Sequence, residues 1–334
     1  VAMASPEVRL VPNAVSYNSV VKACARAGRV VEAASWLRRM MATGVLPDVV
    51  SYNSLVGAYA QAGQVAEALH WLREMEGVGL RPNEISYNSA IHACARAGKA
   101  EEAADCIGLM EAASLRPDVV SFSSVVNAYA RSGCPAKAAG WLGKMEAAGL
   151  DGNVVAYGAV ANAFAREGSV EEAAAWLRRM EARHIKADLK AYSSIVSACA
   201  RAGDTSGAEE WLAKMQGAAL QPDVVAYGGV LEAQGRQGHW GEAAHWLQQM
   251  RARGVRPNLV SFTSAMKACG NAKPPNPDAA EVFLREAVAE GLRPDAVLAG
   301  LALRILGAHR WDALNAELGL RAEVAASLRR GRTA

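Results

Sequence analysis

Residues 49–83 read VVSYNSLVGAYAQAGQVAEALHWLREMEGVGLRPN, and this stretch returns along the chain in altered copies. The pentapeptide VSYNS at Val50 is the clearest marker of it. Copies of the marker stand 35 residues apart, as VSYNS at Val15, ISYNS at Ile85, VSFSS at Val120, VAYGA at Val155, KAYSS at Lys190, VAYGG at Val225 and VSFTS at Val260. A fixed period of this size is the signature of a repeat protein.

Two further markers keep the same period. The string WLREM at Trp71 recurs in related form in most copies, and a Pro followed by Asp or Asn closes most of them. Together the markers predict eight repeats over residues 14–295, with bounds 14–48, 49–83, 84–118, 119–153, 154–188, 189–223, 224–258 and 259–295. We number positions from 1 at the first residue of each repeat; the eighth repeat is two residues longer than the others.

Each repeat carries the pattern of two short helices. Apolar residues at positions 4, 7, 8 and 11 follow one helix face, and those at positions 20, 23, 24 and 27 follow another. Glycine at position 15 and the Gly and Pro near positions 31 and 34 predict the two helix ends in most repeats. A hairpin this small cannot bury its own core, so we predict an all-α solenoid of stacked helix-turn-helix repeats. The tryptophans at position 23 are expected to form a buried stripe.

The two ends differ from the repeats. Residues 1–13 resemble the tail of a preceding repeat or a cap, because VPN at Val11 mimics the usual ending. Residues 296–334 are predicted to form a degenerate capping hairpin with Trp311 and Leu314 on its apolar face, followed by a basic tail. The chain does not begin with Met, so we expect a processed or truncated chain, and its first residues show no secretory signal.

Composition excludes several classes of protein. Of the 334 residues 51% are hydrophobic and 21% are charged, which indicates a folded chain rather than a disordered one. No apolar run approaches the length of a membrane helix. Six scattered cysteines without a CxxC pair do not make a disulfide scaffold. The net charge of +3 neither requires nor excludes an anionic partner, so only the positions of the charged residues can indicate one.

Positions 2, 5, 9 and 13 share one face of the first helix, and this face is not the apolar one. Position 5 is occupied by small or polar residues: Asn18, Asn53, Asn88, Ser123, Gly158, Ser193, Gly228 and Thr263. Position 13 is occupied six times by arginine: Arg26, Arg96, Arg131, Arg166, Arg201 and Arg236. A solvated helix face would explain one such arginine, whereas six at one position predict a ladder that faces a polyanion.

Position 35 holds only Asp or Asn. Its members are Asp48, Asn83, Asp118, Asn153, Asp188, Asp223, Asn258 and Asp295. The simplest role of these residues is to cap the next helix. Capping would also accept Ser or Thr, however, and exchanging Asp for Asn replaces a pure hydrogen-bond acceptor by a group that also donates. This choice is suited to the reading of base edges.

The 35-residue unit with these anchors resembles the pentatricopeptide repeat family, of the P-type, over residues 14–295. The resemblance implies a right-handed solenoid that binds single-stranded RNA in its concave groove, one base per repeat, by two or three side chains. In the family, positions 5 and 35 select the base and position 13 faces the phosphates. Position 2 sandwiches the base, which here assigns Val15, Val50, Ile85, Val120, Val155, Lys190, Val225 and Val260. Lys190 departs from the usual aliphatic residue.

The family's base preferences imply a target. The pairs Asn18/Asp48 and Asn88/Asp118 resemble uracil readers, and Asn53/Asn83 resembles a pyrimidine reader that favours cytosine. Ser123/Asn153 resembles an adenine reader. The remaining pairs are guanine-like or adenine-like: Gly158/Asp188 (G), Ser193/Asp223 (G), Gly228/Asn258 (A) and Thr263/Asp295 (G). The expected site is therefore 5′-UCUAGGAG-3′, in which the two Gly repeats lack a side chain at position 5.

We expect no enzyme, metal site, cofactor, small-molecule substrate or membrane insertion. The zinc-deaminase signature is absent, and the carboxylates after Asp295 are too dispersed for a metallonuclease. Cys24, Cys94, Cys199 and Cys269 occupy position 11 and are expected in the core. The resemblance implies a mitochondrial or plastid protein acting by occupancy in RNA stability, processing or translation. Two alternatives stay open, namely a structural subunit of an organellar ribosome or other large complex, and a protein-binding scaffold like tetratricopeptide proteins.

Overall fold

The computed structural model describes residues 12–320, so residues 1–11 of the predicted N-terminal remnant and the basic tail lie outside the described residues. Within this range the regular structure is helical, without a strand. The helices are α1 (Ala14–Arg26), α2 (Val30–Ala42), α3 (Val49–Gln61), α4 (Val65–Gly77), α5 (Glu84–Arg96), α6 (Ala100–Ala112), α7 (Val119–Arg131), α8 (Pro135–Ala147), α9 (Val154–Glu167), α10 (Val170–Ala182), α11 (Leu189–Ala202), α12 (Thr205–Gly217), α13 (Val224–Gln237), α14 (Trp240–Ala252), α15 (Leu259–Asn271), α16 (Pro277–Ala289), α17 (Ala296–Leu306) and α18 (Ala308–Glu317).

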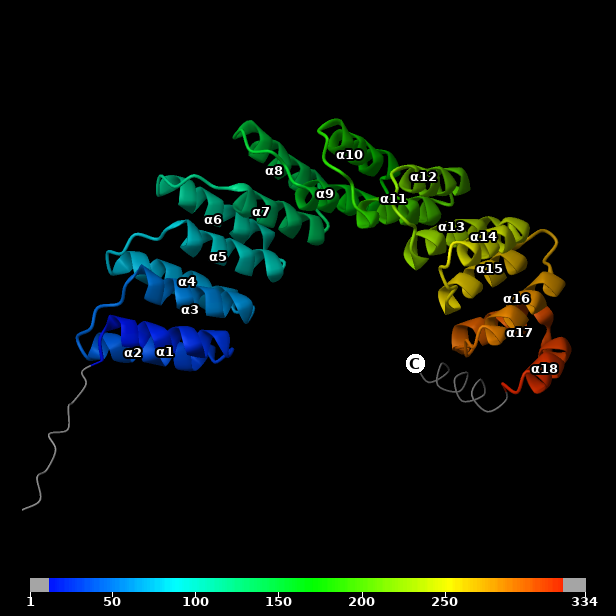
Figure 1. Cartoon of the computed structure of the whole chain (residues 1–334), viewed down its shortest axis with the longest axis horizontal. Coiled ribbons are helices and arrows are strands. Elements are labelled where there is room, and N and C mark those ends of the chain that lie inside the picture. The colour runs from blue at the N-terminus through cyan, green and yellow to red at the C-terminus, as the bar shows by residue number, and fades with distance from the viewer. Residues whose placement is uncertain (1–11, 321–334) are drawn as a thin grey trace, which may run out of the picture. The chain divides into compact units, whose positions relative to one another are not determined.

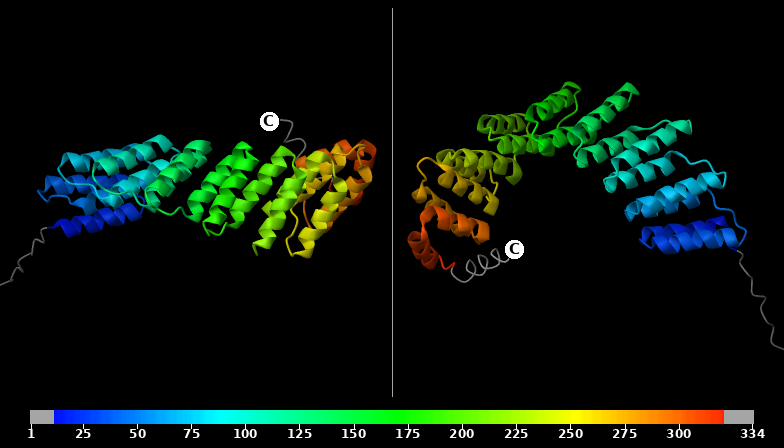
Figure 2. Two further views of the ribbon diagram at one scale, coloured as in Figure 1. Left: turned by 90° about the horizontal axis from the view of Figure 1, so that it is seen from above. Right: turned by 180° about the vertical axis from the view of Figure 1, so that it is seen from behind.

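The chain divides into two compact segments, and the division falls between Val160 and Ala161 within helix α9. In the N-terminal segment the first helices of successive hairpins, α1, α3, α5 and α7, contact one another in order (Figure 1). In the C-terminal segment α11, α13, α15 and α17 do the same (Figure 2). Stacking of hairpins on their sequence neighbours is the architecture of an α-solenoid, so the predicted all-α repeat fold is confirmed.

Each first helix begins directly after an Asp or Asn whose side chain caps it. Asp48, for example, accepts a hydrogen bond from the backbone N–H of Ser51 at 2.9 Å. The same bond is made by Asn13, Asn83, Asp118, Asn153, Asp188, Asp223, Asn258 and Asp295. Such caps satisfy backbone donors that have no partner within the helix. The simplest predicted role of position 35 is therefore present in the structure.

The core of each repeat comes from the predicted apolar positions. In the second repeat Tyr52, Leu55, Val56, Leu72 and Met75 are essentially inaccessible to solvent. The methionine at position 27 is buried in all seven repeats that carry it: Met40, Met75, Met110, Met145, Met180, Met215 and Met250. Close packing of hairpins against their neighbours thus supplies the burial that a single hairpin lacks.

The predicted tryptophan stripe is only partly buried. Trp71 and Trp211 are buried, whereas the others are half-buried: Trp36, Trp141, Trp176 and Trp246. Five of these rings pack in a tilted arrangement against the aromatic residue at position 4, as in Tyr17 and Trp36, whose centroids lie 6.3 Å apart. In several repeats a cation three residues later lies over the ring, such as Lys144 over Trp141 at 3.9 Å. The four half-buried tryptophans therefore lie at the edge of the core.

The cysteines at position 11 largely follow their prediction. Cys94, Cys199 and Cys269 are buried, whereas Cys24 is half-buried. Among residues 12–320, no helix combines the length and the apolar character that crossing a membrane requires.

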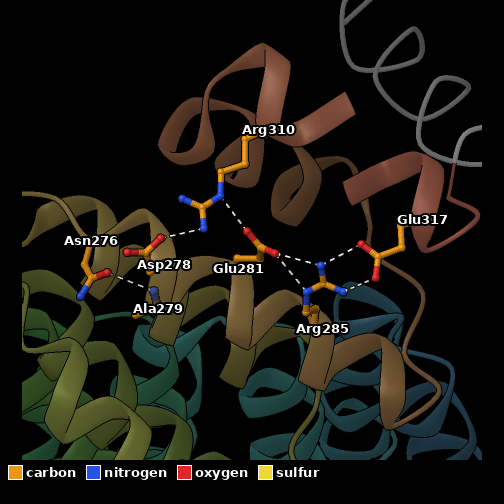
Figure 3. A network of polar contacts seen from close by, with 7 residues as sticks. All are labelled: Asn276, Asp278, Ala279, Glu281, Arg285, Arg310 and Glu317. Atoms are coloured by element: carbon orange, nitrogen blue, oxygen red, sulfur yellow. Dashed lines mark hydrogen bonds and ion pairs between the residues drawn. The ribbon is translucent and has the colours of Figure 1, made fainter. Parts of the chain in front are cut away.

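The C-terminal hairpin α17–α18 packs on α15 and α16, with Trp311 and Leu314 buried as predicted. An ion-pair network ties α18 to α16 (Figure 3). Arg310 contacts both Asp278 and Glu281 at 2.7 Å, and Arg285 bridges Glu281 and Glu317. Hydrogen bonds from Arg310 and Arg285 hold the pKa of Glu281 below its ordinary value, so this network stays charged at neutral pH.

Candidate nucleic-acid interface

An exposed row of aliphatic side chains runs along the first helices. The residues at position 2 lie next to the helix caps and point away from the core. Their exposed fractions are 71% for Val15, 56% for Val50, 63% for Ile85, 61% for Val120, 60% for Val155, 56% for Val225 and 64% for Val260. Lys190 is also exposed. Aliphatic residues that recur at one exposed position provide apolar surface on which a flat ring can be held.

The structure adds Val297 to this row. Val297 follows the cap Asp295 by two residues, as each position-2 residue follows its own cap, and it is 62% exposed. The sequence analysis missed it because α17 belongs to the degenerate hairpin and the eighth repeat is two residues longer. The signal available in the sequence was the Pro-Asp ending at Asp295, which announces another first helix.

In the first three repeats the side chains at positions 5 and 35 are brought together. Asn18 donates from Nδ2 to the carboxylate of Asp48, at 3.1 Å to Oδ1 and 3.3 Å to Oδ2. Asn53 donates to Oδ1 of Asn83 at 3.1 Å. Asn88 makes the corresponding longer contacts to Asp118, at 3.5 and 3.4 Å. These three predicted base-reading pairs are therefore physical pairs.

The other pairs are arranged differently. The hydroxyls of Ser123 and Ser193 are buried and have no hydrogen-bond partner among the described residues. Thr263 donates its hydroxyl to the carbonyl of Leu259, in its own helix. Gly158 and Gly228 offer only backbone, although a Cβ at either position would meet no atom within 4 Å. Neither glycine is therefore required by close packing.

The carboxylates of Asp48 and Asp118 are held in their charged form. Burial tends to raise the pKa of Asp48, but hydrogen bonds from Ser51 and Asn18 outweigh it and lower the pKa below the ordinary value of 3.8. Asp118 behaves in the same way, with Ser121 and Asn88 as its donors. Both side chains are consequently hydrogen-bond acceptors at neutral pH.

All six position-13 arginines are exposed, and several are tethered to the repeat before them. Arg96 donates to the carbonyl of Gln61, Arg201 to that of Ala165, and Arg236 to that of Arg201. These carbonyls lie near the C-terminal ends of the preceding first helices, where positive charge is favourable. Because a guanidinium has five N–H donors, one such bond leaves others for an anion.

Around the sixth repeat, residues at positions 2, 5 and 13 line one surface hollow. This hollow of about 200 Å³ is lined by Asn162, Arg166, Lys190, Ser193, Ser194, Ser197, Arg201 and Val225. It combines two position-2 residues, the position-5 residue Ser193 and two position-13 arginines. Apolar, hydrogen-bonding and cationic groups thus converge at one place.

Serines at position 3 were missed by the sequence analysis. Ser51, Ser86 and Ser121 are fully buried, and each donates its hydroxyl to Oδ1 of the position-5 asparagine one repeat earlier, at 2.5 Å. The signal available in the sequence was a correlation between position 5 of one repeat and position 3 of the next. Every asparagine at position 5 is followed by a serine at position 3 of the next repeat, whereas Ser123, Gly158 and Ser193 are followed by alanine.

Among residues 12–320, no group of three or more His, Cys, Asp and Glu side chains is arranged to hold a metal ion.

Comparison with known proteins identifies the family. The model described as "PPR repeat family" matches residues 12–56, 47–96 and 222–271, and the model described as "Pentatricopeptide repeat-containing protein" matches residues 87–215. No curated protein matches the chain. Similar solved structures include the pentatricopeptide repeat protein PPR10 from maize, at 21% identity and a TM-score of 0.47 over 96% of this chain and 58% of that one.

PPR10 in complex with an 18-nt psaJ RNA element matches at 19% identity and a TM-score of 0.42, over 98% of this chain and 65% of that one. The chain thus spans 58–65% of the length of these PPR10 structures. Nuclear proteinaceous RNase P 2 (PRORP2) from A. thaliana matches at 13% identity and a TM-score of 0.51, over 62% of this chain and 46% of that one, a likeness of fold. With the repeat period, the stacked hairpins and both family models in agreement, the chain belongs to the pentatricopeptide repeat family.

Proposed function

We propose that this protein binds single-stranded RNA sequence-specifically, with one base per repeat read by positions 5 and 35. The observation that carries the proposal is the pairing of Asn18 with Asp48 and of Asn88 with Asp118 beside exposed aliphatic residues. An amide donor next to a carboxylate acceptor complements uracil, whose edge presents a carbonyl oxygen beside an N–H group.

Each base would lie between the position-2 residues of two successive repeats. For the eighth base these would be Val260 and Val297, so the C-terminal hairpin takes part in binding as well as covering the last repeat. The position-13 arginines would contact the phosphates, through the N–H groups that the preceding helix does not use. In this arrangement positions 5 and 35 select the base, whereas the arginines and the aliphatic residues provide most of the affinity.

The proposed target is 5′-UCUAGGAG-3′, and the proposed action is occupancy, without catalysis by this chain. A bound protein would shield the RNA from exonucleases or change its local structure, and so affect the stability, processing or translation of a transcript. Family membership favours a mitochondrial or plastid transcript.

A gel-shift titration tests the proposal. The RNA 5′-UCUAGGAG-3′ in a neutral flanking context is compared with a base-swapped RNA and with DNA of the same sequence. We expect tight binding to the first RNA alone, and a shift of the first-base preference from U toward A in the double variant Asn18→Thr/Asp48→Asn. Equal weak binding to all three nucleic acids would refute sequence-specific recognition.

A further inference from the structure

We propose that Ser51 and Ser121 are positioning residues that fix the amide orientation of the base-reading Asn18 and Asn88 and thereby set the discrimination between uracil and cytosine. This inference rests on the proposed function and assigns a specificity-determining role to position 3 of the following repeat. Its basis is the hydrogen-bond arrangement around Asn18, Asn53 and Asn88.

The two ends of the Asn18 amide are held by different partners. Nδ2 faces the carboxylate of Asp48, while Oδ1 accepts from the hydroxyl of Ser51 at 2.5 Å. The serine oxygen also accepts from the backbone N–H of Asp48 at 3.1 Å, and its single proton lies between Oδ1 of Asn18 at 2.5 Å and Oδ1 of Asp48 at 2.8 Å, of which Asn18 is the nearer acceptor. Reversing the amide would place its oxygen against the carboxylate and remove the nearer of the serine's two acceptors. The observed orientation is thus specified at both ends.

The second and third repeats repeat this arrangement. Ser86 bonds to Asn53, and Ser121 bonds to Asn88, each at 2.5 Å and each from a fully buried position. Buried hydrogen bonds of this kind define a conformation because leaving the donor unpaired is costly. Only one N–H of each amide is needed for position 35, so the other can serve a base as a donor.

The chemical consequence concerns two bases. A fixed Nδ2 donates to the carbonyl oxygen of uracil, whereas a reversed amide would present Oδ1 and accept from the amino group of cytosine. Without the serine hydroxyl only the position-35 side chain would hold the asparagine, so the reversed orientation would be populated more. In the first and third repeats, where position 35 is Asp, the serine therefore favours uracil over cytosine although it does not touch the base.

Repeats with alanine at position 3 show that the serine is not needed for the fold. Ala156 and Ala226 still donate their backbone N–H to the caps Asn153 and Asp223, both at 2.9 Å. The position-5 residue one repeat earlier is Ser123 or Ser193, whose hydroxyl has no partner among the described residues. Replacing serine by alanine is consequently a substitution that the architecture already contains.

The test measures the affinity ratio for U over C at single positions of the target RNA. In Ser51→Ala we expect the ratio at the first base to fall about fivefold, the worth of one net hydrogen bond, with the third base unchanged. Ser121→Ala should give the converse result. Ser51→Thr, which keeps the hydroxyl, should retain the wild-type ratio.

Ser261→Ala is the matched control. Ser261 makes the same capping-box contacts with Asn258, but the position-5 residue one repeat earlier is Gly228, which has no amide to orient. This variant loses the same cap hydroxyl as Ser51→Ala, so a general effect of capping on binding would appear in both. We expect the base ratios of Ser261→Ala to equal those of the wild type.

A gain-of-function pair completes the design. Gly228→Asn places an amide where a Cβ meets no atom within 4 Å, opposite Asn258 and Ser261. We expect it to create selectivity at the seventh base, and Gly228→Asn/Ser261→Ala to lose most of it. A wild-type protein that discriminates U from C while Ser51→Ala keeps the ratio within about twofold would overturn the inference. A wild type without any selectivity would instead refute the proposed function.

Discussion

At the scale of single residues, the tyrosine hydroxyl at position 4 depends on the side chain eleven residues earlier. Tyr87 donates to Glu76 at 2.8 Å and Tyr192 donates to Glu181 at 2.6 Å, in each case across a repeat boundary. Burial and these glutamates raise the pKa of both tyrosines. Tyr52 has Met41 at that place, and its buried hydroxyl has no partner among the described residues.

We therefore expect Met41→Glu to stabilise the protein by about 1 kcal/mol, because it supplies the missing acceptor. The free energy of unfolding in urea, compared with that of the wild type, measures the gain. In the background of Tyr52→Phe the same substitution has no hydroxyl to accept from, so the gain should disappear. A stabilisation that survives in the Phe background would show that the glutamate acts by another route.

The lowered pKa of Asp48 gives a second prediction at this scale. A folded-state pKa below the ordinary 3.8 means that the ionised carboxylate stabilises the fold above that pH, and that this contribution is lost as pH falls through the folded pKa. Asp48→Asn keeps the cap but cannot titrate. The difference in unfolding free energy between the two proteins should stay constant above about pH 5 and change only in more acid solution. A change near pH 6 would contradict the assignment.

At the scale of the element, helix α17 carries both a packing face and Val297. We expect Val297→Asp to weaken binding of the eight-base RNA about fivefold, since it removes apolar contact and adds a charge like that of phosphate. Binding of a seven-base RNA that lacks the last base should not change. Val282→Asp on α16 is the control, because Val282 is 51% exposed but lies outside the position-2 row. Equal losses in both variants would remove Val297 from the interface.

The ion-pair network of α16 and α18 gives a second prediction for an element. Arg310→Ala breaks the contacts to Asp278 and Glu281, so amide hydrogen exchange in α18 should become faster, with α13–α14 unchanged. High salt should reduce the difference, because ion pairs of exposed groups are screened. Arg304→Ala on the neighbouring α17 removes an exposed arginine outside this network and should leave exchange in α18 as it is.

The helices and their caps were predictable because period, Gly and Pro positions and Asp/Asn endings are local signals. The pairing of positions 5 and 35 was predicted from the family resemblance. The contact of the Ser51 hydroxyl with Asn18 was not predicted. This contact spans 33 residues and depends on how one hairpin is placed on the next. The partial exposure of Trp36 has a similar origin, since its cover by Arg39 depends on side-chain geometry.

At the scale of the whole molecule, six arginines at one position predict a strong salt dependence of RNA binding. If each arginine neutralises one phosphate, the logarithm of the binding constant should fall linearly with the logarithm of the salt concentration, with a slope of about −4. Arg131→Ala should reduce the magnitude of the slope by about 0.7. Arg236→Ala should reduce it less, because Arg236 already pairs with Glu232 at 2.8 Å. A binding constant insensitive to salt would exclude phosphate contacts as the main source of affinity.

The cap at each repeat boundary has a consequence for how new targets could be acquired. One side chain both starts a helix and faces the proposed ligand, so folding restricts which residues recognition can use there. Exchange between Asp and Asn is compatible with folding, because both residue types cap the next helix in this chain, as Asp48 and Asn83 do. Target preference can therefore drift by single substitutions that keep the cap, and a designer can retarget one repeat without rebuilding its neighbours.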